Sequence, residues 1–220
     1  MPSQGRGITP TFWRLLLDED LRTKTVVDVG TGAGRVALAL APLCRAVIGI
    51  DRDAGPIAEA SRNAKAAGLT NATFVVADAD TLPHFRDLTG DAARPDVVVA
   101  HMFLSDALIV NAAATVPRGG AIVCCGFHVD HWRETGRPSR FAYDESRMRQ
   151  RLESHGFAVE YLDVERDVQE FPSLEAALAA SIGLEERWRS DGRWFRYIEF
   201  LEQGGRTLTR ALLVAKARRQ

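Results

Sequence analysis

The chain has 220 residues, of which 46% are hydrophobic and 26% charged, and its formal net charge is −1. A chain of this length buries roughly 70% of its unfolded surface and can fold as one domain with at most a modest insertion. The near-neutral charge gives no general attraction to nucleic acid or to an anionic membrane, so it favours a small or locally charged ligand.

The N-terminal run and the cysteines both indicate a cytoplasmic protein. The run MPSQGRGITP lacks the apolar core of a secretory signal, and no apolar segment approaches the roughly 20 residues of a membrane span. Cys44, Cys124 and Cys125 show no CxxC spacing, which favours reduced core thiols over a disulfide or zinc framework. We expect no membrane contact and no metal site.

Apolar segments rich in Val, Ile and Ala are expected to form seven strands. In chain order these are residues 25–30, 46–51, 72–77, 95–100, 120–127, 157–164 and 207–215. Helices are expected between them at residues 33–43, 54–67 and 142–155. The first five strands are nearly continuous apolar runs, typical of parallel strands buried on both faces. The predicted fold is therefore α/β, a doubly wound and mostly parallel sheet with helices on both faces.

Residues 172–205, between the last two expected strands, are predicted to form a helical insertion. The insertion carries Trp188 and Trp194 in the run EERWRSDGRWF, where aromatic and basic residues alternate with acids. We interpret it as an amphipathic lid over a ligand, with plain helical packing and a nucleic-acid patch as the alternatives. The expected organisation is a single domain over residues 1–220 that contains this lid.

A glycine-rich turn follows the first expected strand. Residues 28–34 read DVGTGAG, so a carboxylate precedes three glycines at alternate positions. Glycines let a ligand approach the backbone where N–H groups and the dipole of the next helix are available. The dinucleotide fingerprint GxGxxG needs its third glycine at position 35, where this chain has Arg35. This spacing disfavours a nicotinamide dinucleotide.

An acid followed by GxGxG resembles the first motif of the class I S-adenosylmethionine (SAM)-dependent methyltransferases. Asp51 and Asp78, which end the second and third expected strands, extend the resemblance. It covers residues 20–165 and the final strand at 207–216. It implies a Rossmann-like methyltransferase with SAM as cofactor and S-adenosylhomocysteine as product.

The resemblance also implies the cofactor site. The glycine-rich turn would hold the methionine part, Asp51 the ribose, and Asp78 the adenine edge. The two carboxylate oxygens of Asp51 match the two ribose hydroxyls. The full set is Asp28, Gly30, Thr31, Gly32, Gly34, Asp51, Arg52, Asp78, Ala79 and His101. Local capping by Asp28, a solvated strand end at Asp51 and an Asx turn at Asp78 are the structural alternatives.

Two histidines are candidates for catalysis, because ligands of open α/β sheets bind at the carboxyl ends of strands. His101 follows the fourth strand and could take a proton near neutral pH, or could simply pack and hydrogen-bond to the backbone. His128 follows the fifth strand, close to Asp130 and His131, but a metal site there lacks a third ligand of clear spacing. A base is needed only where the methyl acceptor must lose a proton.

The sequence thus predicts a methyltransferase that acts on a small molecule through oxygen, carbon or nitrogen. After the fourth strand the chain reads HMFL, unlike the Asn or Asp, two prolines and aromatic of enzymes that methylate exocyclic amines. A binding module of the same fold without turnover and an NAD(P)-dependent oxidoreductase are the alternatives. The sequence does not identify the acceptor or the oligomeric state, and it is compatible with a homodimer.

Overall fold

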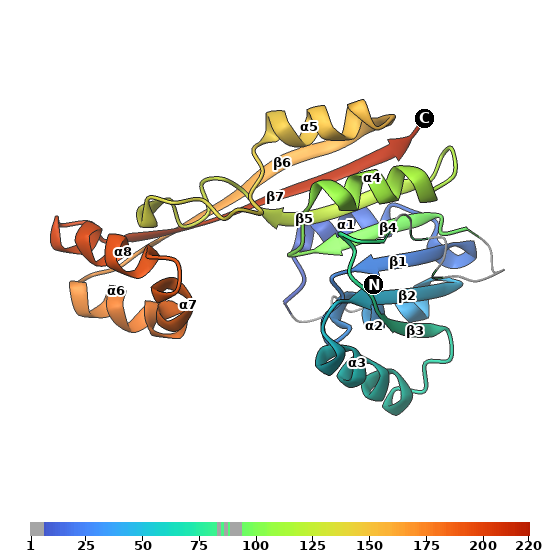
Figure 1. The fold of residues 1–220 in the computed structure, drawn as a ribbon, viewed down its shortest axis with the longest axis horizontal. Coiled ribbons are helices and arrows are strands. Elements are labelled where there is room, and N and C mark those ends of the chain that lie inside the picture. Colours follow the sequence, from blue (N-terminus) through green and yellow to red (C-terminus); the bar gives the residue numbers. More distant parts are fainter. Residues whose placement is uncertain (1–6, 83–84, 86–87, 89–93) are drawn as a thin grey trace.

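The computed structural model describes residues 7–82, 85, 88 and 94–220. Its strands form one sheet of order β3-β2-β1-β4-β5-β7-β6 (Figure 1). The strands are β1 (Thr25–Val29), β2 (Ala46–Asp51), β3 (Ala72–Val76), β4 (Val97–His101), β5 (Ala121–Phe127), β6 (Phe157–Glu170) and β7 (Thr207–Arg219). Only β7 runs antiparallel to its neighbours. This confirms the predicted doubly wound, mostly parallel sheet of seven strands.

The strand order reverses between β1 and β4. Chain connections leave the sheet in opposite directions at such a point, which opens a crevice beyond the carboxyl ends of the two strands. The glycine-rich turn follows β1 and the run HMFL begins at the end of β4. The fold therefore brings these two segments to the same crevice.

Helices cover both faces of the sheet (Figure 1). One face carries α1 (Pro10–Leu17), α2 (Arg35–Leu40) and α3 (Ala54–Ala66), and the other carries α4 (Asp106–Thr115) and α5 (Glu145–Ser154). Successive residues of β1 alternate between the two cores, with Val26 on the α1 side and Val27 on the α4 side. Among the described residues, no helix has the length and apolar character that crossing a bilayer requires.

Helix α4 was not among the elements expected from the sequence. Its residues, DALIVNAAAT, are apolar on most sides and give no clear periodicity. The helix begins at a cap instead, because the hydroxyl of Ser105 accepts a hydrogen bond of 3.1 Å from the N–H of Leu108. Its other end stops before Val116, whose backbone is extended.

Strands β6 and β7 continue past the rest of the sheet as a two-stranded ribbon (Figure 1). At the far end of the ribbon lie α6 (Leu174–Ser181), α7 (Glu185–Arg189) and α8 (Arg193–Glu202). We call these three helices the helical lobe. The lobe has its own core, which contains Phe171, Ala177, Trp188, Trp194, Tyr197 and Leu201. The predicted helical insertion before the last strand is therefore present, and both strands that carry it are longer than expected.

Candidate functional site

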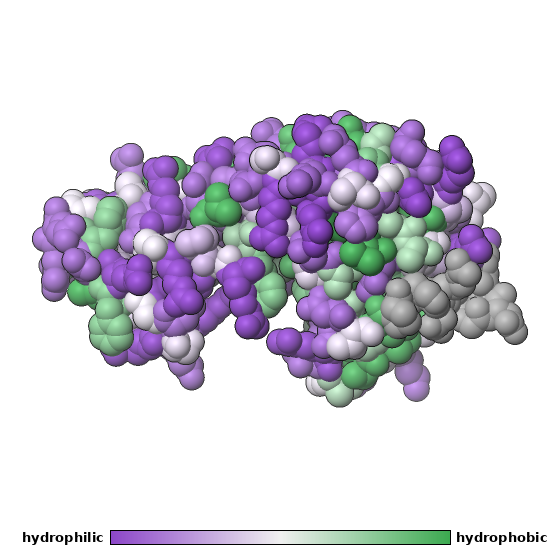
Figure 2. All heavy atoms as spheres, turned by 45° about the horizontal axis from the view of Figure 1, so that its top comes forward, coloured by the Kyte–Doolittle hydropathy of each residue, from purple (hydrophilic) through white to green (hydrophobic). Residues whose placement is uncertain are grey.

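A pocket of about 330 Å³ opens at the carboxyl ends of β1 to β4, where the strand order reverses. Five of the predicted cofactor residues line it: Gly30, Asp51, Arg52, Asp78 and Ala79. The opposite wall comes from the segment after β4, from the end of β5 and from the helical lobe. The molecular surface is hollowed between the lobe and the body of the molecule (Figure 2).

The glycines of the turn after β1 all have left-handed backbone angles. The φ values are +70° at Gly30, +53° at Gly32 and +85° at Gly34, a region in which side chains are strained. A Cβ added at Gly30 would lie 2.9 Å from the Cβ of Phe103, whereas one added at Gly32 would meet no described atom within 4 Å. The turn thus leaves its middle glycine facing open space, which is what close approach of a ligand requires.

Asp28 lies behind the turn rather than in the pocket. Its side chain is buried, and its Oδ2 accepts hydrogen bonds from the Thr31 hydroxyl at 2.6 Å and from the Ala37 N–H at 3.1 Å. Burial raises the pKa of this carboxyl to about 7, against the opposing effect of the two hydrogen bonds. In this position Asp28 and Thr31 shape the turn and do not line the pocket.

The carboxylate of Asp51 joins the end of β2 to the turn. Its Oδ2 accepts a hydrogen bond from the N–H of Gly32 at 2.9 Å, and its Oδ1 accepts one from the N–H of Asp53 at 3.1 Å. Each carboxylate oxygen has further lone-pair capacity, so the same group can also accept hydrogen bonds from a pair of adjacent hydroxyls. The position and free lone pairs of the Asp51 carboxylate fit the ribose of SAM.

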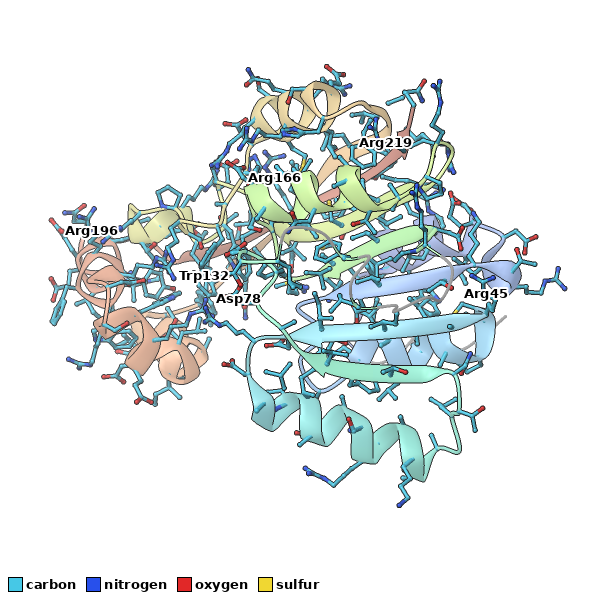
Figure 3. The ribbon with its side chains drawn as sticks, turned by 45° about the vertical axis from the view of Figure 1, so that its right-hand side comes forward. Arg45, Asp78, Trp132, Arg166, Arg196 and Arg219 are labelled. Carbon is cyan, nitrogen blue, oxygen red and sulfur yellow. The ribbon has the colours of Figure 1, made fainter. Side chains whose placement is uncertain are left out.

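Asp78 occupies the corresponding position beyond β3. Its Oδ1 accepts a hydrogen bond of 2.9 Å from the N–H of Asp80, which is the Asx turn named above as the structural alternative. The side chain nevertheless lines the pocket, next to the buried Ala79. Figure 3 shows Asp78 and Trp132 together in the region between the strand ends and the helical lobe.

His101 is engaged by the N-terminal segment. Its Nε2 accepts a hydrogen bond of 3.1 Å from the N–H of Thr9 and lies 3.0 Å from the Thr9 hydroxyl. Burial, and then the charges of Arg35 and Arg210, lower the pKa of His101 to about 4. The ring is therefore neutral at physiological pH, with its proton on Nδ1, and in this arrangement it presents a donor rather than a base.

His128 is buried on the other side of β5. Its Nε2 lies 3.0 Å from Oε2 of Glu145, and its Nδ1 accepts a hydrogen bond of 3.1 Å from the N–H of Asp130. Both ring nitrogens are thus occupied. Within the described ranges, no group of three or more His, Cys, Asp or Glu side chains is arranged to hold a metal ion.

Several pocket residues escaped the sequence analysis. Met102 has a φ of +65°, a left-handed conformation that non-glycine residues seldom adopt and that clusters at functional sites. Its neighbour Phe103 packs against Gly30, and Phe141 and Arg187 reach the pocket from distant parts of the chain. For Met102 and Phe103 the sequence offered one signal, their position directly after β4, because ligands of such sheets bind at the carboxyl ends of strands. Nothing in the sequence singled out Phe141 or Arg187.

A family model described as a methyltransferase domain matches residues 26–120, which run from β1 to the turn before β5. This part of the chain is similar to the methyltransferase-domain family, and the whole chain has the fold of class I SAM-dependent methyltransferases. SAM is the cofactor of this family, and the resemblance read from the glycine-rich motif is confirmed. The fold brings Gly30 of the motif, Asp51 and Asp78 to one pocket.

Solved structures and curated relatives resemble this chain to different extents. The YcgJ protein of Bacillus subtilis superposes with a TM-score of 0.70 at 16% identity, over 96% of this chain and 98% of that one. Magnesium protoporphyrin IX methyltransferase of Synechocystis PCC 6803, solved with SAM bound, gives 0.59 at 17% identity, over 96% and 76%. These likenesses show the fold.

One curated relative is an uncharacterized RNA methyltransferase of Caldanaerobacter subterraneus subsp. tengcongensis. It is 35% identical over 80 residues, which is 36% of this chain. The chain spans only 17% of the length of that relative. The relative is named an RNA methyltransferase, whereas the sequence analysis favoured a small-molecule acceptor over nucleic acid.

Proposed function

We propose that this chain transfers the methyl group of SAM to a small-molecule acceptor, through an oxygen, carbon or nitrogen atom. The observation that carries the proposal is the Asp51 carboxylate, which is bonded to the glycine-rich turn and lines a pocket whose other wall is aromatic. When bound, SAM supplies a methyl group on a good leaving group. The task left to the protein is to bind, to orient and to exclude water.

The strand ends supply the cofactor half of the pocket. Asp51 would hold the ribose hydroxyls while it keeps Gly32 in place. Oδ2 of Asp78 has no hydrogen-bond partner among the described residues. It would accept a hydrogen bond from the adenine amino group. Left-handed Gly32 leaves room for the amino-acid part of the cofactor against the backbone.

The acceptor half lies toward the helical lobe. Phe127 at the end of β5, Phe141 and Arg187 form this wall of the pocket. Apolar rings would fix an acceptor by shape, and the lobe would cover it. Holding two reactants in line can contribute several kcal/mol, roughly 7 to 11 in well-oriented systems.

A base plays a limited part in this arrangement. The lone pairs of both candidate histidines are taken, by Thr9 at His101 and by Asp130 at His128. The site as arranged suits an acceptor atom that is nucleophilic without help. A role of His101 as a proton acceptor requires that Thr9 first moves away from Nε2.

RNA is the second candidate acceptor, and the name of the curated relative is what favours it. The local similarity does not extend over most of that relative, and the net charge of −1 lacks the basic excess typical of RNA-binding proteins. We therefore place the small-molecule acceptor first.

Two measurements test the proposal in sequence. Calorimetric titration with S-adenosylhomocysteine should show binding, and absence of heat at about millimolar ligand would overturn it. Methyl-labelled SAM is then incubated with the protein and either a low-molecular-weight metabolite extract or total RNA. We expect label in small molecules, whereas label confined to RNA would favour the second candidate.

A further inference from the structure

We infer that the methyl acceptor is a planar organic acid, with its anionic group held between Arg187 and Arg210 and its ring against Phe127. This inference rests on the proposed function and names the class of its substrate. It begins from two arginines beside the acceptor half of the pocket that have no acidic partner within the described part of the chain. A buried histidine lies near both.

Arg187 is the pocket-lining cation of the helical lobe. Its guanidinium lies 5.6 Å from the centre of the Trp132 ring, and no described carboxylate lies within ion-pair distance of it. Its neighbours differ, because Arg189 pairs with Glu185 at 2.7 Å and Arg193 pairs with Asp191 at 3.1 Å. Arg189 and Arg193 are thus neutralised, whereas Arg187 lines the pocket without a described acidic partner.

Arg210 lies on β7 next to Ala211, whose N–H donates a hydrogen bond to Nδ1 of His131, and it is not among the residues that line the pocket. It is exposed, and Asp167 stands directly opposite on β6, yet the structure shows no ion pair between them. Glu165, two residues earlier on β6, forms no described pair with Arg210 either. After burial, the charge of Arg210 contributes to the lowered pKa of both His101 and His131, so its field extends over the ends of β4 and β5.

His131 packs against the aromatic residues beside the pocket. Its ring centre is 4.5 Å from that of Phe127 and 4.4 Å from that of Trp132. Burial, and then the charges of Arg210, Arg187 and Arg193, lower the pKa of His131 to about 4 against the opposing effect of the hydrogen bond from Ala211. The two unpaired arginines thus act on one neutral ring.

The hydrogen bonds of His131 leave one donor unused. Its Nδ1 accepts the N–H of Ala211 at 3.1 Å, so the neutral ring carries its proton on Nε2. That Nε2 is buried and has no partner among the described residues. A buried donor without a partner costs about 1 to 3 kcal/mol, and the Nε1 atoms of Trp13 and Trp188 are in the same state.

These features together describe a receptor for an anion attached to a flat ring. Two guanidinium groups supply charge-assisted hydrogen bonds, which are the strong ones in proteins. The neutral ring of His131 packs against Phe127 and adds no charge there. Phe127 and Phe141 offer apolar faces to the pocket, and Phe141 is 40% exposed at its rim.

The test uses the intact protein saturated with S-adenosylhomocysteine. The probes are 4-hydroxybenzoate, 4-hydroxyphenylacetate and indole-3-carboxylate, each compared with its methyl ester by calorimetry. We expect at least one acid to bind about tenfold more tightly than its ester, since one charged hydrogen bond is worth roughly this factor. Arg187→Gln and Arg210→Gln should each remove that preference.

Arg196→Gln is the matched control. Arg196 lies at the outer end of the same lobe (Figure 3), where it donates to the carbonyl of Gly136 at 3.3 Å. The control removes the same charge and should keep the preference for acids. All three variants should bind S-adenosylhomocysteine as the wild type does, because neither Arg187 nor Arg210 belongs to the cofactor half.

Each other outcome overturns the inference. Acids and esters that bind alike, or acids that fail to bind at about 10 mM with S-adenosylhomocysteine in place, would show that no anion site exists. A single-stranded RNA oligonucleotide that binds more tightly than every acid, and loses affinity on the same two substitutions, would assign the arginines to phosphates of nucleic acid. Failure to bind S-adenosylhomocysteine would instead refute the proposed function itself.

Discussion

The carboxylate of Asp51 accepts a hydrogen bond of 2.9 Å from the backbone N–H of Gly32, which links the end of β2 to the turn between β1 and α2. The groups expected to hold the ribose and the methionine part of SAM are therefore joined to each other by the protein alone. A site ordered in this way loses less conformational entropy on binding than one assembled from loose loops.

Substitution of Gly32 by Ala should separate stability from binding. The φ of +53° is strained for alanine, at about 1 to 2 kcal/mol, while the added Cβ meets no described atom. Gly68→Ala is the matched control, because Gly68 has a φ of +68° and equally free surroundings after α3. Both variants should lose similar unfolding free energy, and calorimetry should show weaker S-adenosylhomocysteine binding for Gly32→Ala alone. Equal affinities would contradict the assigned role of the turn.

The buried Asp28 should give the protein a characteristic pH dependence. Because burial raises its pKa from 3.8 to about 7, the folded state holds the proton more tightly than the unfolded chain does. Its contribution to stability is complete below the unfolded pKa and is lost as pH rises through 7. The unfolding free energy of the wild type relative to Asp28→Asn should therefore fall by up to about 4 kcal/mol from about pH 4 to pH 8. Denaturant titrations at several pH values measure it, and a constant difference would refute the raised pKa.

Glu19 lies at the amino end of the sheet, far from the pocket, and should matter for stability alone. Burial alone would raise the pKa of Glu19, but hydrogen bonds from Arg218, Lys216 and Lys24 hold it well below its ordinary value. Lys216 is itself buried, 2.8 Å from Oε1 of Glu19. Glu19→Gln should cost about 3 to 5 kcal/mol of unfolding free energy, because a buried cation loses its partner. Affinity for S-adenosylhomocysteine should not change, and the exposed Asp18→Asn serves as control.

The helical lobe should be separable from the cofactor half. Trp188 is fully buried in the lobe core, with its ring 5.0 Å from that of Trp132 and 5.4 Å from that of Tyr197. Trp188→Ala should destabilise the lobe by about 3 to 5 kcal/mol, as large-to-small core substitutions do. Hydrogen exchange should then increase in α6 to α8, and methyl transfer should fall while S-adenosylhomocysteine still binds. Ile182→Ala, at a 71% exposed position of the same lobe, should change neither.

The sequence was sufficient for the central sheet because its strands are buried on both faces. Such strands must be apolar throughout, so β2 was located residue for residue at Ala46–Asp51. The sequence also predicted that Asp144 caps α5. In the structure the Asp144 side chain accepts a hydrogen bond of 2.7 Å from the N–H of Arg147. Local chemistry fixes both features.

Features that depend on contacts between distant segments were not predictable. The apolar helix α4 has no polar face to give it a period, and β6 runs to Glu170 because β7 pairs with it along the ribbon. Thr9 and His101 are 92 residues apart, and their contact changes His101 from a candidate base into a hydrogen-bond donor. Arg187 likewise enters the pocket only because the ribbon places the lobe there. The glycine-rich motif thus identified the cofactor half, while the acceptor half came from tertiary structure.

The affinity of Asp51→Ala for S-adenosylhomocysteine tests the central claim most directly. The substitution removes the acceptor for Gly32 N–H and for the ribose together, so calorimetry should show affinity at least about tenfold weaker than in the wild type. Asp53→Ala, two residues further on at the same rim, should bind nearly as well as the wild type. If Asp51→Ala is folded and binds with undiminished affinity, the assignment of this pocket to SAM is wrong.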